Sequence, residues 1–341
     1  MSKTFTVALG AAAVTLAFGA AQAQEQMKLH HFVPPKAFPH SRFVQPWADK
    51  VEKESGGKLK IQVFPAMQMG GTPPQLVDQV KDGVADIVWT LPGYTPARFP
   101  KTEIFEIPFL HTNAVATALA LQDYYDAHLK DEYKDVHVLL LHCHDGALTH
   151  ASKAIVKLED FKGLKIRTAN RGGSVFLRGV GATAIGAPVP EVPQMLSKGV
   201  IDGALLPYEI ALPLKVHELV KFHSEFAGAQ PRSGTSVFLF AMNKKRYEAL
   251  PADLKKVIDA NSGRNIAQMA GQTWVDIEKP GKEAAMAAKN QFPVMPAGEV
   301  ARVKAAVQPE IEKFLKELAE KGIDAPKLYA EAQKLVAKYT K

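Results

Sequence analysis

The sequence predicts an α/β fold of two similarly wound lobes, each a mostly parallel sheet flanked by helices, with a ligand cleft between them. Three observations predict this fold. Strand-like and helix-like segments alternate along the chain, two short patterns recur in the same order, and helical periodicity prevails from about residue 250 onward. The length of 341 residues agrees with about two domains of ordinary size.

The first 23 residues have the pattern of a signal peptide. Lys3 supplies a positive charge, an apolar run extends from Phe5 to about Ala20, and the small-x-small pattern ends at Ala23. The run of about 16 residues is short for a membrane anchor, which needs ~20. We therefore expect cleavage after Ala23 and a soluble periplasmic protein with no direct membrane insertion.

The first half of the mature chain shows strand and helix in turn. Residues 58–64 alternate apolar and polar side chains, which predicts a strand ended by Pro65. A helix is predicted from Thr72 and its two following prolines to Asp82, with Gly83 at its end. Residues 86–90 predict the next strand.

Two short patterns recur along the chain. Residues 59–62 (LKIQ) reappear as 164–167 (LKIR), each followed by a glycine pair, and residues 81–86 (KDGVAD) reappear as 197–202 (SKGVID). Chance is the alternative, since glycines commonly separate helices from strands. Two echoes in the same order favour a duplicated strand–helix–strand unit. Two such lobes form a cleft where ligands bind beyond the carboxyl ends of the strands.

The composition argues against several classes of protein. The formal net charge of +7 is dispersed, with no run of five basic residues, so nucleic acid is not an expected partner. Cys143 is the sole cysteine, which excludes an internal disulfide. Nucleophile-elbow, P-loop and dinucleotide-binding motifs are absent, and the sequence names no catalytic machinery.

The histidines raise the alternative of a zinc site. His142 and His144 flank Cys143, and His30–His31 and His150 are further candidates. None has the tight spacing that marks a metal site, so we expect neither metal nor cofactor. We expect His144 to donate a hydrogen bond in the cleft. A carboxylate-processing enzyme that uses the histidine pair stays as an alternative.

Arg167 is the strongest candidate for ligand binding. It ends a predicted strand, in the place that neutral Gln62 holds in the other copy. A guanidinium there can hold a carboxylate through two parallel hydrogen bonds, although a surface ion pair is the alternative. Residues 89–100 follow the matching strand, and this loop contributes Trp89, Tyr94 and Arg98 as a candidate cleft wall.

Residues 158–167 (LEDFKGLKIR) resemble the signature of the solute-binding proteins of tripartite ATP-independent periplasmic (TRAP) transporters, DctP type. Residues 181–183 (GAT), 200–203 (VIDG) and 250–254 (LPADL) also match, in the right order, over essentially the whole mature chain. The resemblance implies a two-lobed periplasmic-binding-protein fold with crossing strands and a long helix. It also implies a monomeric receptor that delivers its ligand to TRAP membrane permease subunits, and it makes Arg167 the carboxylate clamp.

Two departures from the family pattern bear on the ligand. Many members have Glu-Asn-Pro where this chain has Leu205-Leu206-Pro207, and receptors for acidic sugars have an arginine near Ala147. Each change removes a polar partner, and a buried unpaired polar atom costs about 1–3 kcal/mol. The changes therefore favour a ligand with a single carboxylate.

The remaining candidate residues fit such a ligand. Phe32 and Tyr208 join Trp89 and Tyr94 as apolar contacts, and Asn170 joins Arg98 and His144 as polar ones. We expect an aromatic monocarboxylate of benzoate, phenylglyoxylate or hydroxycinnamate type. A small 2-oxo acid, a C4-dicarboxylate and zinc are the alternatives.

The lobe boundaries follow from the same pattern. Residues 24–147 and about 235–275 are assigned to the first lobe, and 148–234 with about 276–341 to the second. Helices are expected after Leu250, from Pro309 to Ala319 and from Pro326 to Tyr339, the last two as surface helices of the second lobe.

Overall fold

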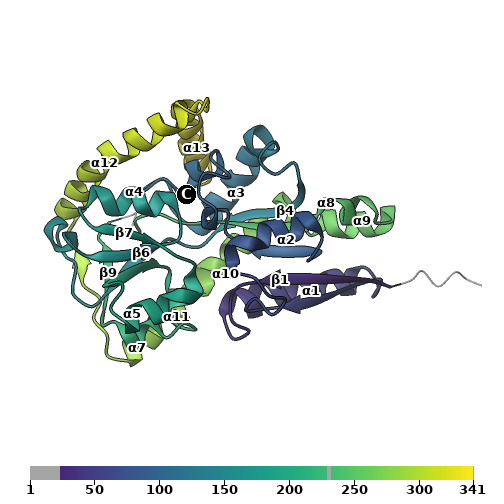
Figure 1. Cartoon of the computed structure of the whole chain (residues 1–341), viewed down its shortest axis with the longest axis horizontal. Helices are drawn as coiled ribbons and strands as arrows, with labels where there is room; N and C mark the ends of the chain where they lie inside the picture. Colours follow the sequence, from purple (N-terminus) through teal and green to yellow (C-terminus); the bar gives the residue numbers. More distant parts are fainter. Residues whose placement is uncertain (1–23, 229–231, 341) are drawn as a thin grey trace, which may run out of the picture.

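The computed structural model describes residues 24–228 and 232–340, so the expected signal peptide lies outside the described residues. Two sheets lie side by side, each flanked by helices (Figure 1). The first sheet has the strand order β2-β1-β3-β10-β4, and the second has the order β11-β9-β5-β8-β6-β7. The predicted α/β class with two lobes is confirmed.

The strands of the first sheet are β1 (Glu25–His31), β2 (Leu59–Phe64), β3 (Ile87–Thr90), β4 (Val136–Cys143) and β10 (Val237–Asn243). Those of the second are β5 (Leu148–Ala151), β6 (Lys165–Thr168), β7 (Thr183–Gly186), β8 (Gly203–Leu206), β9 (Phe222–Phe226) and β11 (Val294–Met295). In each sheet three neighbouring strands are parallel, namely β2-β1-β3 and β7-β6-β8.

β5 and β10 are the first strands that the chain forms after it crosses from one lobe to the other, and both run antiparallel to their neighbours. After β4 the chain crosses to the second sheet and forms β5, which is antiparallel to β8 and β9. After β9 it returns and forms β10, which is antiparallel to β3 and β4. Two chain segments between the sheets, 144–147 and 232–236, are therefore adjacent, and Ala147 and Gly234 form a β-bridge there.

The helices are α1 (Gln45–Glu54), α2 (Leu76–Asp82), α3 (Ala114–Tyr124), α4 (Arg171–Gly179), α5 (Val192–Ser197), α6 (Tyr208–Ala211), α7 (Val216–Leu219), α8 (Lys244–Glu248), α9 (Ala252–Ala260), α10 (Arg264–Asp276), α11 (Glu278–Ala287), α12 (Ala297–Ala319) and α13 (Ala325–Tyr339). Short 3-10 helices include η2 (Pro73–Gln75), η3 (Pro92–Tyr94), η4 (Thr102–Glu106) and η7 (Val189–Glu191). None of the described helices is long and apolar enough to cross a bilayer.

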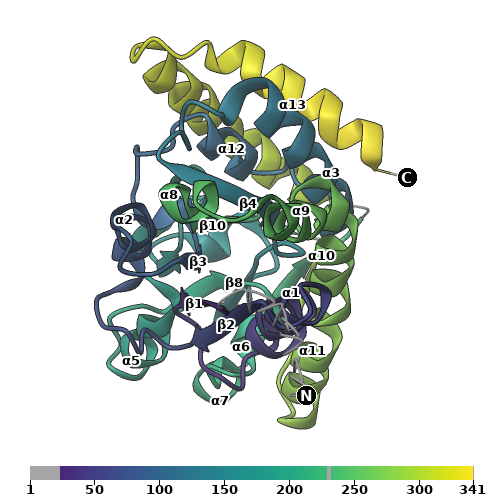
Figure 2. The same ribbon diagram turned by 90° about the vertical axis from the view of Figure 1, so that its right-hand side faces the viewer.

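One pair of helices joins the lobes along one side of the molecule (Figure 2). α10 packs on α3 and β4 of the first lobe, and α11 packs on α6 of the second. Ile277 alone separates the two helices. The lobes are therefore joined by this continuous connection and by the two crossing segments, and also by the turn between α12 and α13.

The C-terminal helices differ from the expectation in two ways. α12 packs on α4 of the second lobe, but α13 packs on α3 of the first (Figure 1), so 276–341 is not wholly a second-lobe segment. The helix expected to begin at Pro309 begins at Ala297, and Pro309 lies inside it. Pro309 is exposed, so solvent can satisfy the carbonyl that its missing N–H leaves unbonded.

The internal repeat is present, but one of its two alignments was wrong. Asp86 accepts a hydrogen bond from the Lys28 amide at 2.7 Å, and Asp202 accepts one from the Lys165 amide at 2.8 Å. β1 is therefore the counterpart of β6, and β2 that of β7. Lys28 thus matches Lys165. Two residues further along each strand, Arg167 matches His30 and not Gln62. A four-residue alternating pattern was too short to distinguish neighbouring parallel strands.

Candidate ligand-binding site

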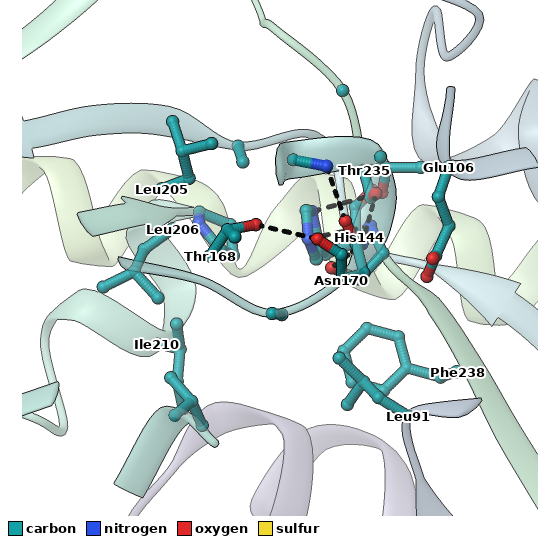
Figure 3. Close-up of a pocket in the computed structure, with 18 of the residues that line it drawn as sticks. Leu91, Glu106, His144, Thr168, Asn170, Leu205, Leu206, Ile210, Thr235 and Phe238 are labelled. Atoms are coloured by element: carbon teal, nitrogen blue, oxygen red, sulfur yellow. Dashed lines mark hydrogen bonds between the residues drawn. The ribbon is translucent and has the colours of Figure 1, made fainter. Parts of the chain in front are cut away.

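A cavity lies between the lobes, at the carboxyl ends of β3, β6 and β8 and beside the crossing segments (Figure 3). It therefore lies where the strand-end rule placed the cleft. The first lobe contributes to its lining Phe32, Trp89, Leu91, Tyr94, Glu106 and Phe238. The second lobe contributes Arg167, Thr168, Asn170, Phe176, Leu205, Leu206, Glu209 and Ile210. The crossing segments contribute His144, Ala147, Thr235 and Ser236.

Arg167 lies in this cavity with 1% of its surface exposed. Its Nε donates to the Ala187 carbonyl at 2.8 Å and its Nη1 to the Leu205 carbonyl at 3.5 Å, while Nη2 has no hydrogen-bond partner among the described residues. Burial lowers the pKa of Arg167, but Tyr94 and Glu191 oppose that shift. A guanidinium keeps its charge in such a site. The cavity thus contains a buried cation with a free donor.

Tyr94 connects the two lobes next to that cation. η3 carries it from the end of β3, and its hydroxyl accepts a hydrogen bond from the Val189 amide of the second lobe at 3.1 Å. Burial raises the pKa of Tyr94, so its hydroxyl stays neutral. Tyr94 therefore serves as a wall of the cavity and as a contact across the cleft.

Aromatic rings form the first-lobe wall. The Trp89 indole is stacked between Phe32 at 5.2 Å and Phe238 at 4.7 Å between ring centres. Its Nε1 donates to His142 Nε2 at 2.9 Å. Both faces and the polar atom of Trp89 are thus used inside the protein. The first-lobe wall is therefore a packed block of aromatic rings in which Phe32 and Phe238 cover the Trp89 indole.

His144 and Asn170 line the cavity, as predicted, but their polar atoms hold the protein together. The His144 ring nitrogens lie 3.1 Å from the amides of Gly146 and Ser236, one in each crossing segment. Asn170 accepts from the Gly173 amide at 2.8 Å and so caps α4, and its Nδ2 donates to Ser236 Oγ at 3.0 Å. Burial lowers the pKa of His144 well below its ordinary value, so the ring is neutral.

Two predicted site residues lie outside the cavity. Arg98 pairs with Asp78 at 2.8 Å on the first lobe. Tyr208 is buried behind the β8 strand end, where its hydroxyl donates to Glu225 at 3.1 Å. The expectation for these two failed because the loop after β3 turns back at η3, and because α6 points successive side chains in different directions.

Two carboxyl groups that the sequence analysis did not single out line the cavity. Glu106 and Glu209 are each 2% exposed, and Oε2 of each has no hydrogen-bond partner among the described residues. Burial raises the pKa of Glu106 to about 8 and that of Glu209 well above its usual range. The signal was present in the sequence, because Glu106 is a lone acid in the apolar run 104–109 (IFEIPF).

The positions that depart from the family pattern do face the cavity. Ala147, Leu205 and Leu206 all belong to its lining, as does Pro207, which matches the family pattern. The carbonyl of Leu205 accepts from Arg167 Nη1, so one of the changed positions lies directly beside the guanidinium. The cavity wall at these positions is consequently apolar.

The histidines proposed as alternative zinc ligands bond to other protein groups. His30 bonds to Gln79, His31 to His40 and His150 to His223, at 2.6, 2.9 and 2.6 Å respectively. Burial raises the pKa of the Cys143 thiol. Within residues 24–228 and 232–340, no three acidic, histidine or cysteine side chains are grouped as a metal site would require.

The family model of bacterial extracellular solute-binding proteins, family 7 (DctP), matches residues 29–318. The chain belongs to this family. The family contains solute-binding receptors, and the resemblance carried by residues 158–167 is confirmed. The solute-binding protein is also 26% identical over 310 residues to the outer membrane transporter protein TsaT of Comamonas testosteroni, covering 89% of this chain and 90% of the relative.

Solved structures share the fold of this solute-binding protein closely. A marine metagenome TRAP solute-binding protein specific for aromatic acids, in complex with 3-hydroxybenzoate, is 43% identical with a TM-score of 0.92, over 94% of this chain and 100% of that chain. A TRAP solute-binding protein of Rhodoferax ferrireducens T118 with copurified benzoate is 42% identical with a TM-score of 0.90, over 92% and 98%. The expected two-lobed fold is thereby confirmed.

Proposed function

We propose that this solute-binding protein binds an aromatic monocarboxylate, of the benzoate or hydroxybenzoate kind, and delivers it to a TRAP permease. The observation that carries the proposal is the Arg167 guanidinium, which is buried in an aromatic cavity and whose Nη2 has no partner in the part of the chain that the structure describes. A ligand carboxylate is the group that satisfies such a donor, through a charge-assisted hydrogen bond.

The rest of the cavity fits an aromatic body. Phe32, Tyr94 and Phe238 provide ring surfaces, while Leu206 and Ile210 close the opposite side (Figure 3). Burial of apolar ligand surface against these side chains contributes roughly 25 cal/mol per Å². The apolar body of the ligand therefore adds affinity through burial, and the Arg167 cation adds both affinity and orientation.

The same cavity disfavours a second carboxylate. The positions where other family members carry polar groups are Ala147, Leu205 and Leu206 here. A C4-dicarboxylate or a sugar acid would bury polar atoms against them without partners, at about 1–3 kcal/mol for each atom. The two relatives bound to 3-hydroxybenzoate and benzoate support the aromatic alternative.

The family supports a periplasmic location and a permease partner. An extracellular receptor needs export, for which residues 1–23 supply a suitable signal peptide with cleavage after Ala23. A receptor of this kind works with membrane permease subunits, and closure of the lobes over the ligand creates the form that docks on them. The proposed role requires no chemical conversion of the ligand.

A thermal-shift screen of the ligand-stripped mature protein tests the proposal. Benzoate at ~100 times its dissociation constant should stabilise the folded state by about 2.7 kcal/mol. Benzamide, which has the same shape without the charge, tests the carboxylate, and cyclohexanecarboxylate tests the flat ring. Stabilisation by 2-oxo acids, succinate or galacturonate in place of aromatic acids would refute the aromatic ligand, and stabilisation by zinc alone would refute the organic-anion role.

A further inference from the structure

Glu106 faces the cavity from the lobe opposite to Arg167. η4 positions it on the first lobe, and its Oε1 accepts a hydrogen bond from the Val237 amide at 3.0 Å. Its Oε2 is inaccessible to solvent and has no hydrogen-bond partner among the described residues. Figure 3 shows the carboxyl group beside the Asn170–His144 network, on the same side of the cavity as the Phe238 ring.

The carboxyl group of Glu106 is neutral near pH 7. Burial raises its pKa to about 8, and the nearby Glu103 carboxylate acts in the same direction, against the Val237 amide and the Asn170 side chain. A protonated carboxyl group both donates and accepts hydrogen bonds. It can therefore bind a hydroxyl group, which also does both.

Glu106 and Arg167 do not satisfy each other. Glu106 Oε2 and Arg167 Nη2 line the same cavity, yet neither has a hydrogen-bond partner within residues 24–228 and 232–340, so the two atoms do not pair directly. Leaving either atom unbonded in a buried site is unfavourable. A ligand that reaches from one to the other satisfies both, with a carboxylate at the guanidinium and an uncharged polar group at the carboxyl.

We propose that Glu106 is a specificity-determining residue that binds a ring hydroxyl of the ligand, so that this protein prefers hydroxylated aromatic acids to unsubstituted ones. This inference rests on the proposed function and deepens it. The carboxylate is held by the second lobe and the hydroxyl by the first, so the ligand itself links the lobes. A ligand with a second carboxylate at the hydroxyl position would place that negative charge beside Glu106, and no cation of the described cavity lining would neutralise it there. Such a ligand is therefore disfavoured.

The test measures affinity ratios by calorimetry on the ligand-stripped full mature chain. The ligands are benzoate, the three hydroxybenzoate isomers and their methoxybenzoate counterparts, which lack the donor. In the unchanged protein the best hydroxybenzoate should bind about tenfold more tightly than benzoate, and its methoxy counterpart should lose that advantage. Because both affinities in such a ratio are measured on the same variant, an effect of the substitution on folding stability does not change the ratio.

Two substitutions then locate the hydroxyl contact. Glu106→Gln keeps a donor and an acceptor and should retain most of the preference for hydroxybenzoate. Glu106→Leu should abolish the preference, so that hydroxybenzoate and benzoate bind this variant within about threefold of each other, and Glu106→Met replaces it if the leucine variant does not fold. Glu209→Leu is the matched comparison, since Glu209 is the other buried carboxyl in the lining and lies on the lobe of Arg167.

The outcomes separate the two proposals. Equal affinity for benzoate and every hydroxybenzoate overturns the role of Glu106 but leaves the aromatic receptor intact. The same holds if Glu106→Leu retains the preference, or if Glu209→Leu alone removes it. If no aromatic acid binds the unchanged protein, the proposed function fails and this inference fails with it.

Discussion

The Tyr94 hydroxyl accepts a hydrogen bond from the Val189 amide at 3.1 Å, which joins the first lobe to the second beside the cavity. A salt bridge between Arg171 and Glu103 at 2.9 Å makes a second contact across the cleft. Both contacts exist only while the lobes are together. Ligand affinity and lobe contact are therefore linked through side chains that need not touch the ligand.

Tyr94→Phe should weaken ligand binding about fivefold, since loss of one neutral hydrogen bond costs about 1 kcal/mol. Tyr247→Phe is the matched control, because the Tyr247 hydroxyl bonds to Asp259 within the first lobe at 2.7 Å. Calorimetric titration with the best aromatic acid measures both variants. A loss of equal size in the two variants would contradict a role for the contact across the cleft.

Arg167→Ala should reduce affinity for aromatic carboxylates by about 100-fold or more, because removing one partner of a buried charge pair costs several kcal/mol. Arg167→Lys should recover only part of this loss, since an ammonium does not reproduce the planar fork. Arg98→Ala is the control, as Arg98 pairs with Asp78 outside the cavity. Near-native affinity in Arg167→Ala would show that the carboxylate binds elsewhere.

Gly172→Ala should hinder contact between the lobes. A Cβ at this position would lie 1.8 Å from the Glu106 carbonyl oxygen, a contact that no rotamer can relieve. We expect affinity to fall by at least tenfold, with a larger radius of gyration in the presence of ligand by small-angle scattering. The stability of the separate lobes should change little.

Gly298→Ala is the control for Gly172→Ala. Gly298 also lies in the first turn of a helix, α12, but a Cβ there would meet nothing within 4 Å. This variant should bind ligand normally and melt at the same or a slightly higher temperature, since alanine favours helix. Equal affinity in both glycine variants would show that the clearance at Gly172 does not matter for binding.

Glu106 should make the stability of the protein depend on pH. Its pKa of about 8 in the folded state exceeds the ordinary 4.5, so the folded state binds the proton more tightly. This stabilisation is full below pH 4.5 and is lost as pH rises through 8. Buried neutral histidines such as His142, with a pKa of about 3, act with the opposite sign below pH 6.5.

The comparison of Glu106→Gln with the unchanged protein isolates this effect, because the histidines are common to both. Between pH 5 and 9 the unchanged protein should lose more free energy of unfolding than Glu106→Gln, as measured by urea denaturation at each pH. Parallel profiles over this range would mean that Glu106 is ionised in the folded state, contrary to this account.

The sequence predicted the fold where local chemistry decides the structure. η2 and α2 together run from Pro73 to Asp82, and Gly83 follows in a left-handed conformation with φ of 78°, as the pattern required. Arg167 reached the cavity because parallel strand ends converge on one edge of a sheet. These features depend on a few neighbouring residues, and therefore one sequence suffices to find them.

The sequence could not determine features that depend on contacts between distant segments. α13 packs on α3 through its apolar face. The apolar periodicity of α13 in the sequence does not specify on which of the two lobes this face packs. The placement of Arg98 and Tyr208 depends on the direction of short loops after a strand. Glu106 is a lone acid in an apolar run, but only the packed structure places it opposite Arg167.

The hydrogen bonds of Arg167 have a consequence for the order of events in binding. The acceptors of its Nε and Nη1, the Ala187 and Leu205 carbonyls, both belong to the second lobe. These two hydrogen bonds orient the guanidinium from within the second lobe. Under the proposed function, an arriving carboxylate meets a half-site that the second lobe has already ordered, and the first lobe then closes over it. The Arg167 side chain therefore loses its conformational entropy when the chain folds and not when the ligand binds. The free energy of ligand binding is more favourable by that amount.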